Sequence, residues 1–143
     1  MFNYFSASIL LLTIILLPVK AEDITINHIG PDMNQPWGMD FISNNEVIVT
    51  EKSGNIFRIN INNGDYIKVS NTPNISSVMQ GGLLDVIFDD NSVYLCYSKD
   101  TSNGTITAID SAILSDDQLI NLKTIFESNA SGWTDVHFGC RLE

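Results

Sequence analysis

The chain has 143 residues, of which 17 are Asp or Glu and only 7 are Lys or Arg, so its formal net charge is −10 at pH 7. Seven scattered basic residues cannot replace the counterions of a nucleic-acid backbone, and an anionic membrane surface would repel this chain. Disorder is also excluded, because 44% of the residues are hydrophobic and only 17% are charged. The length indicates one domain.

The N-terminus has the features of an export signal. Residues 7–17 form an apolar run of 11 residues, and Val19 and Ala21 occupy the −3 and −1 positions of a signal-peptidase site. The run is too short to cross a bilayer as a helix, which takes about 20 residues. No Lys or Arg precedes it, so an uncleaved anchor or a buried helix is the alternative. We predict a signal peptide over 1–21 and a periplasmic or secreted domain over 22–143.

Beyond the leader the sequence is typical of short β-strands rather than helices. Runs rich in Ile, Val, Phe and Tyr each end at a turn of Asn, Asp, Ser or Gly. The predicted strands are 37–42, 46–51, 55–61 and 66–69, then 82–88, 92–98, 105–114 and 122–127. A longer loop over 70–80 separates the two groups, so two antiparallel meanders are expected, over 38–69 and 83–126.

The two groups of strands repeat one another. Residues 36–50 align with residues 82–96 at a constant shift of 46 and without a gap, so that turn falls on turn. A repeat of this length with four strands is typical of a β-propeller blade. The segment HFGCRLE, residues 137–143, is predicted to belong to the first strand of a third blade. The predicted fold is therefore all-β, with two propeller blades and one strand of a third, and an ordinary antiparallel sandwich is the alternative.

Three segments carry a resemblance to a known family. QPWGMDF (35–41) opens the first repeat, QGGLLDV (80–86) opens the second and HFGCRL (137–142) opens the third. In this order and spacing they resemble the soluble, exported glucose/sorbosone dehydrogenases, also called aldose sugar dehydrogenases. The resemblance covers residues 35–142. It implies a six-bladed propeller, of which this chain holds the N-terminal part, and a pyrroloquinoline quinone cofactor bound with calcium.

Such an enzyme needs a base. Oxidation of an aldose at C1 removes a hydride, which the quinone accepts, and a hydroxyl proton, for which histidine is the best acceptor near neutral pH. His28 precedes the strands and is expected on the surface, whereas His137 begins an inner-type strand. The resemblance implies that His137 is the catalytic base; a histidine packed at a blade edge is the alternative. Asp135 is assigned no role, because Val136 separates it from the histidine.

Gln80 lies at the equivalent lip of the preceding blade. Its amide both donates and accepts hydrogen bonds, as a sugar hydroxyl requires, and the resemblance implies a substrate-binding role. The alternative is a loop residue that satisfies backbone groups of the Gly81-Gly82 turn. Trp37 is predicted to belong to the core rather than to line a channel.

No metal site is predicted in this chain. The Asp89-Asp90 pair is expected to lie solvated in a tight turn rather than to bind calcium. The resemblance places the calcium ligands and the quinone contacts in later blades. Cofactor-binding residues are therefore not identified here, and the chain alone is expected to bind neither group and to be inactive.

The two cysteines are predicted to be unpaired. Cys96 and Cys140 each lie in an apolar, strand-like context, where a free cysteine behaves as a small hydrophobic residue. A disulfide between them is the alternative, since the sequence says nothing about their separation in space.

Three functions compete at this point. The leading one is the N-terminal part of an exported, quinone-dependent sugar dehydrogenase that acts on a small-molecule sugar. The second is a non-catalytic extracytoplasmic propeller that binds a partner or a glycan, because this scaffold hosts many functions. The third is a propeller hydrolase or lactonase, which would need a cluster of carboxylates that this sequence does not show. Neither nucleic acid nor, after signal cleavage, a membrane is an expected partner, and no oligomeric state is predicted.

Overall fold

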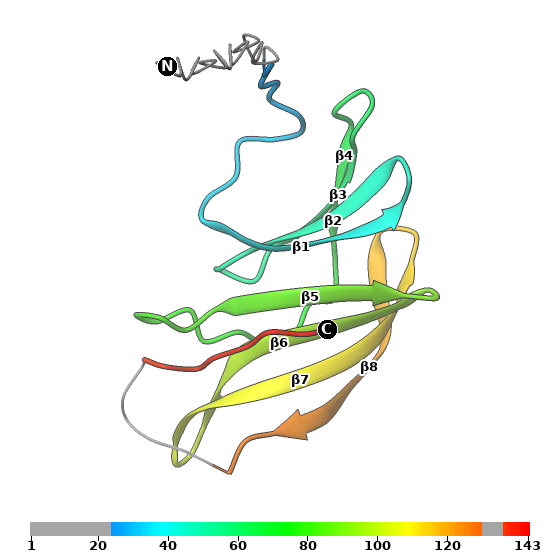
Figure 1. The fold of residues 1–143 in the computed structure, drawn as a ribbon. Coiled ribbons are helices and arrows are strands. Elements are labelled where there is room, and N and C mark those ends of the chain that lie inside the picture. The colour runs from blue at the N-terminus through cyan, green and yellow to red at the C-terminus, as the bar shows by residue number, and fades with distance from the viewer. Residues whose placement is uncertain (1–23, 130–135) are drawn as a thin grey trace, which may run out of the picture.

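The computed structural model describes residues 24–129 and 136–143, and this part contains eight strands in two antiparallel sheets (Figure 1). The first sheet comprises β1 (Pro36–Ser43), β2 (Glu46–Glu51), β3 (Ile56–Asn60) and β4 (Tyr66–Val69). The second comprises β5 (Leu83–Asp89), β6 (Ser92–Thr101), β7 (Gly104–Ser115) and β8 (Gln118–Glu127). In both sheets neighbouring strands follow chain order, which is the meander that the short turns predict.

The prediction of two separate four-stranded meanders is confirmed. Within residues 24–129 and 136–143 the sheets share no strand ladder, and an isolated bridge between Ser70 and Gln118 joins their outer edges. The boundaries agree with the predicted ones to within three residues except at β8, which begins at Gln118 rather than at residue 122. Asn121 interrupts the apolar pattern at an irregularity in the ladder, but the tight turn after Ser115 pairs that residue directly with Gln118.

The repeat is regular at the turns and irregular along the first strands. The turn-closing pairs are Ser43–Glu46 and Asp89–Ser92, which agree with the shift of 46 residues. A β-bulge between Phe41 and Ser43 then adds one residue to β1. Because side chains alternate between the two faces of a strand, an ungapped alignment assigns residues of β1 to the wrong face.

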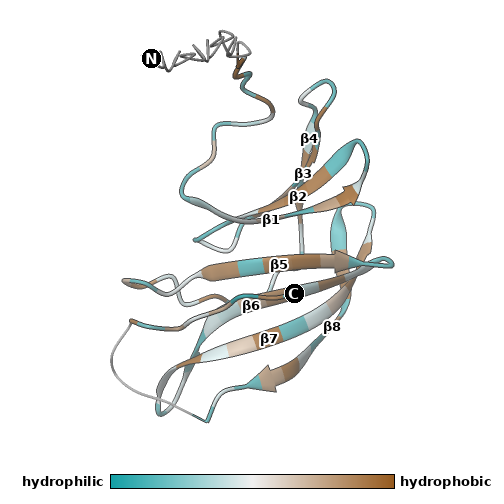
Figure 2. Cartoon of the chain, in the orientation of Figure 1, coloured by the Kyte–Doolittle hydropathy of each residue, from teal (hydrophilic) through white to brown (hydrophobic). Residues whose placement is uncertain are grey.

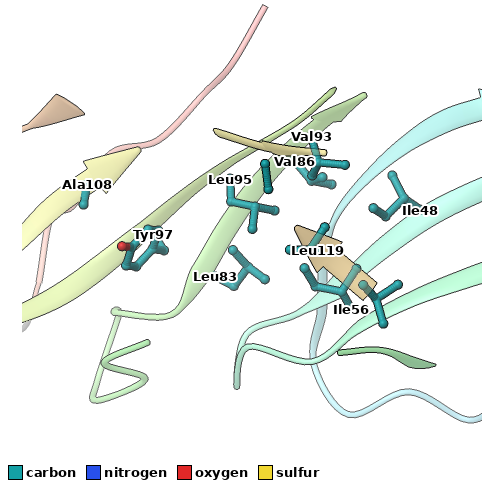
Figure 3. Packing of buried hydrophobic residues seen from close by; sticks show 11 residues of the cluster. Ile48, Ile56, Leu83, Val86, Val93, Leu95, Tyr97, Ala108 and Leu119 are labelled. Carbon is teal, nitrogen blue, oxygen red and sulfur yellow. The ribbon is translucent and has the colours of Figure 1, made fainter. Parts of the chain in front are cut away.

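The main core lies between the two sheets. It is formed by buried apolar side chains from both: Ile48, Ile56, Val69, Leu83, Val86, Val93, Leu95, Tyr97, Ala108, Ala112 and Leu119. Figure 3 shows Ile48 and Ile56 beside Leu119 of the other sheet. Burial of each large aliphatic side chain contributes about 1.5–3 kcal/mol. Val47, Val49 and Ile59 form a smaller cluster on the opposite face of the first sheet. In Figure 2 hydrophobic colours accordingly follow the strands, and hydrophilic colours concentrate at the turns.

Two glycines allow the blades to approach closely. A Cβ atom on Gly38 of β1 would lie 3.0 Å from the Cα atom of Asp85 in β5. A Cβ atom on Gly82 would lie 2.5 Å from the carbonyl oxygen of Lys52. Only a residue without a side chain fits at such contacts without displacing backbone. Next to them, the Leu83 N–H donates to that same carbonyl at 3.0 Å.

Two buried or half-buried aspartates tie separate segments together. In each, one carboxylate oxygen accepts a hydrogen bond from the backbone N–H of the next residue. The other oxygen accepts an N–H from a neighbouring segment: Asp40 from Phe88 of β5, and Asp85 from Leu142, both at 2.8 Å. Hydrogen bonds to a charged acceptor are stronger than neutral ones, so these contacts hold the segments in register.

The C-terminal segment, residues 136–143, runs beside β5 and β6 (Figure 1). It joins no ladder among the described residues, so a third-blade strand there stays a prediction. Cys140 in this segment forms a disulfide with Cys96 of β6, at a Cα–Cα distance of 5.8 Å. The prediction of unpaired cysteines is therefore wrong. The residues are 44 positions apart, and only the return of the chain over β6 brings them together.

The predicted leader, residues 1–21, lies outside the described residues. Across residues 24–129 and 136–143, no helix is long and apolar enough to cross a membrane.

Glu51, at the end of β2, is a buried acid whose surroundings favour its charged form. The Asn34 N–H at 2.6 Å, the Asn55 side chain at 2.5 Å and the Ser53 hydroxyl at 3.4 Å all donate to its carboxylate. Burial is the largest single influence and opposes ionisation, but the hydrogen bonds together outweigh it. They hold the pKa of Glu51 below its ordinary value of 4.5.

We predict an acid-sensitive contribution of Glu51 to stability. Because its pKa is lower in the folded than in the unfolded chain, the contribution is complete above the ordinary value of 4.5 and is lost as the pH falls through the lower folded pKa. Urea unfolding at a series of pH values should show this loss, and Glu51→Gln should flatten it. Asp32→Asn, at a fully exposed carboxylate, is the matched control and should leave the pH dependence unchanged. Equal acid sensitivity of Glu51→Gln and the wild type would contradict the prediction.

Candidate functional site

Three chain segments meet at one end of the two sheets. Trp37 lies at the start of β1, Gln80 lies in the loop before β5, and His137 lies near the start of the C-terminal segment. The starts of these three segments lie on the same side of the molecule, at the left in Figure 1. They line a hollow of about 280 Å³, which is completed by Leu84, Phe138 and Gly139. The structure thus brings the two residues singled out from the sequence, Gln80 and His137, to one place.

Gln80 contacts His137 directly. Its Oε1 atom accepts a hydrogen bond from the backbone N–H of His137 at 2.9 Å, across 57 residues of sequence. The two polar atoms of an amide diverge from its carbon, so the Nε2 group can donate to a ligand while the oxygen holds the backbone. Gln80 therefore links the loop before β5 to the C-terminal segment, and its Nε2 group can still donate to a ligand in the hollow.

The backbone at His137 is in the left-handed region. Its φ is 64°, and Gly139 and Cys140 follow with φ values of 70° and 80°. For a residue with a side chain this conformation costs roughly 1–2 kcal/mol, and it is found where the surroundings impose it, often at functional sites. The His137 side chain itself is exposed beside the hollow, where a ligand can reach it.

The loop that carries Gln80 is fixed by a buried serine. The Ser98 hydroxyl of β6 accepts the N–H of Gly82 at 2.6 Å and donates to the carbonyl of Ser76 at 2.5 Å. A Cβ atom on Gly81 would lie 2.6 Å from that hydroxyl, so the glycines allow the loop to lie against β6. Ser98, rather than the Gln80 side chain, satisfies the turn, which leaves Gln80 available to His137.

The prediction that Trp37 belongs to the core is wrong. The residue is 55% exposed and lines the hollow. Once the extra residue of the bulge in β1 is counted, Trp37 corresponds to Leu84, which lines the same hollow but is buried. The exposure of Trp37 is therefore a feature that the repeat alignment does not predict, with or without a gap.

Few charged groups lie near the hollow in the described part of the chain. Lys52 donates to the carbonyl of Met79, the residue before Gln80, at 2.5 Å. Arg141 is exposed and lies 3.7 Å from Glu143. No group of three or more His, Cys, Asp or Glu side chains among the described residues could hold a metal ion.

The other singled-out residues lie elsewhere. His28 is exposed in the N-terminal segment, 3.6 Å from Asp32, away from the hollow. Asp89 ends β5 and Asp90 lies in the turn to β6, and both are exposed. Asp135 lies outside the described residues.

Comparison with known proteins establishes the family. The model of the glucose/sorbosone dehydrogenase family matches residues 33–143, so the chain belongs to this family. Aldose sugar dehydrogenase YliI of Escherichia coli is 27% identical over 128 residues, which are 83% of this chain and 34% of that protein. The resemblance inferred from the sequence motifs is therefore confirmed.

Solved structures agree with this assignment. The apo-form of the soluble aldose sugar dehydrogenase from Escherichia coli is 27% identical and has a TM-score of 0.71, over 77% of this chain and 34% of that one. The PQQ-bound aldose sugar dehydrogenase from Streptomyces coelicolor is 20% identical with a TM-score of 0.63, over 74% of this chain and 34% of that one, and supports the fold alone. The chain spans about a third of the length of these relatives.

We predict that Gln80 protects the backbone amide of His137. Loss of one hydrogen bond of about 1 kcal/mol corresponds to roughly fivefold faster exchange of that amide with solvent. Gln80→Leu should show this acceleration in an NMR hydrogen-exchange experiment, with the Leu95 amide of β6 as an internal reference. Gln80→Glu keeps an oxygen acceptor and should retain the protection. Unchanged exchange in Gln80→Leu would show that the contact has no protective role.

Proposed function

We propose that this chain is the N-terminal, substrate-facing part of an exported sugar dehydrogenase, in which His137 is the general base at C1 of an aldose and Gln80 orients the sugar. The observation that carries the proposal is the convergence of these two residues, 57 positions apart, on one hollow. Membership of the glucose/sorbosone dehydrogenase family supplies the reaction class.

The described residues supply the proton-transfer half of such a reaction. A neutral imidazole accepts a hydroxyl proton, and the exposed ring of His137 is accessible to a sugar in the hollow. The Nε2 group of Gln80 can donate to a sugar oxygen, because its Oε1 atom is held by the His137 backbone. Trp37 and Leu84 add apolar walls, against which the C–H groups of a sugar can pack.

Pyrroloquinoline quinone would accept the hydride when bound. It is a tricarboxylic acid, so its site must offer several cationic groups or a calcium ion. Lys52 already donates to a backbone carbonyl, Arg141 pairs with Glu143, and the described residues form no cluster of metal ligands. These residues do not fit the quinone and calcium on their own, and we assign them no step of its chemistry. This mismatch supports our proposal that the remaining contacts belong to a longer form and that the 143-residue chain alone is inactive.

Export is the second part of the proposal. The apolar run at residues 7–17 and the Val19/Ala21 pair support cleavage after Ala21. Mass spectrometry of the exported protein should find Glu22 as its first residue. Ala21→Leu, which places a large side chain at the −1 position, should retain the leader. An intact Met1 on wild-type protein in a membrane fraction would overturn the proposal of a cleaved signal.

The catalytic roles lead to a graded kinetic prediction. In a full-length form that carries this segment, His137→Ala should lower the rate of aldose-dependent dye reduction by about 10²–10⁴-fold, because a positioned base is lost. Gln80→Ala removes one neutral hydrogen bond to substrate and should lower the rate only several-fold. His28→Ala is the matched control and should leave the rate unchanged.

Two results would contradict these roles. Dye reduction by full-length His137→Ala near the wild-type rate would remove His137 from the mechanism. If full-length wild-type protein shows no turnover, and both it and His137→Ala bind sugar, the alternative of a non-catalytic binding propeller is favoured. The isolated 143-residue chain should show no turnover when quinone, calcium and sugar are added, and measurable turnover there would refute the proposal that the cofactor site is completed elsewhere.

A further inference from the structure

The Cys96–Cys140 disulfide joins a buried strand to the segment that carries His137. Cys96 lies in β6 and is 2% exposed, so one end of the bond is fixed in the second sheet. Cys140 is three residues after His137. Three residues of extended chain span at most about 10 Å, so the anchor at Cys140 directly limits where His137 can lie.

The other attachments of this segment are single hydrogen bonds. The Thr107 hydroxyl donates to the Phe138 carbonyl at 2.7 Å, the Leu142 N–H donates to Asp85, and the His137 N–H donates to Gln80. None of them belongs to a strand ladder, and none of residues 136–143 is fully buried. The bond to the buried Asp85 carboxylate is the strongest of the three, but it holds Leu142, five residues after His137. The other two are partly or fully solvated, so water replaces them readily and each contributes only about 1 kcal/mol. Among the described contacts of this segment, the disulfide is the only covalent one.

The backbone conformation makes such a constraint necessary. His137 and Cys140 both have left-handed φ values, which residues with side chains adopt only when the surroundings impose them. The disulfide holds the second of these residues covalently, and Gln80 holds the first by a hydrogen bond.

We propose that Cys96 and Cys140 are positioning residues, whose disulfide holds His137 beside Gln80 and the hollow. The importance of this placement for catalysis rests on the proposed function, but the placement itself does not. A dithiol reductant would break the S–S bond by supplying two electrons and two protons, giving two cysteine thiols while the reductant becomes a disulfide. Release of the C-terminal segment would follow. The site would then assemble in an oxidising compartment outside the cytoplasm and come apart under reducing conditions.

The two histidines of this chain provide the test. NMR spectra of the histidine-labelled chain report His137 and, as an internal control, His28, which lies away from the hollow. We compare the oxidised chain, the chain treated with dithiothreitol, and Cys96→Ala/Cys140→Ala. Without the disulfide, the ring signals of His137 should move to random-coil positions, and its amide should exchange at least tenfold faster. The signals of His28 and the amide of Leu95 should not move, and reoxidation of the reduced chain should restore the original spectrum.

Further variants keep the proposal open to refutation. Cys140→Ala leaves Cys96 as a small buried thiol and should release His137 as the double variant does, whereas Thr107→Val removes only the hydrogen bond to Phe138 and should release it less. Unmoved His137 signals in a folded chain without the disulfide would overturn the proposal. Loss of the sheet signals in all three disulfide-free preparations would also overturn it, because the bond would then be a general staple of the domain.

The readout separates this inference from the proposed function, because it uses no sugar or cofactor. If His137 is released on reduction but full-length His137→Ala stays active, the anchor stands and the catalytic role falls. If His137→Ala is inactive but the His137 signals do not respond to loss of the disulfide, the anchor falls and the catalytic role stands.

Discussion

Close backbone contact between the first strands of the two blades is the constraint on which this structure depends. Gly38 of β1 lies against Asp85 of β5, and Gly82 lies against the carbonyl of Lys52. A side chain at either glycine would push the sheets apart and open the apolar core between them. The carboxylate of Asp40 adds a hydrogen bond to Phe88 across the same interface. The position of β5 relative to β1 is thus set by contacts that only glycine permits, supported by one charged acceptor.

The hollow is a consequence of that contact. Because β1 and β5 start on the same side of the molecule, Trp37 and the loop before β5 are brought together there (Figure 1). Each wall of the hollow is supported in a different way. Pairing with β2 holds the strand that carries Trp37, the buried Ser98 hydroxyl holds the loop of Gln80, and a disulfide holds the segment of His137. The proposed base therefore rests on the only one of these supports that responds to redox conditions.

The local sequence patterns predicted most of the fold. Apolar runs closed by Asn, Asp and Gly turns located all eight strands, since turn chemistry and the two-residue alternation of a strand act between near neighbours. The missed start of β8 follows from the same rule, because Asn121 interrupts the apolar pattern at a ladder irregularity while the hairpin still pairs the residues before it. The motifs at residues 35–41, 80–86 and 137–142 also led to the correct family and singled out Gln80 and His137.

The sequence by itself thus determined the strands, their grouping into two blades and the family. The tertiary structure alone decided three features of the site. Trp37 lies exposed at the hollow rather than in the core, and the return of the chain over β6 joins Cys96 to Cys140. The approach of two distant segments lets the His137 N–H donate to the Gln80 oxygen. The physical reason is the distance along the sequence over which each interaction acts. Strands and turns are set by neighbouring residues, whereas the disulfide and the Gln80–His137 bond join positions 44 and 57 residues apart. A bulge likewise depends on how one strand pairs with its partner.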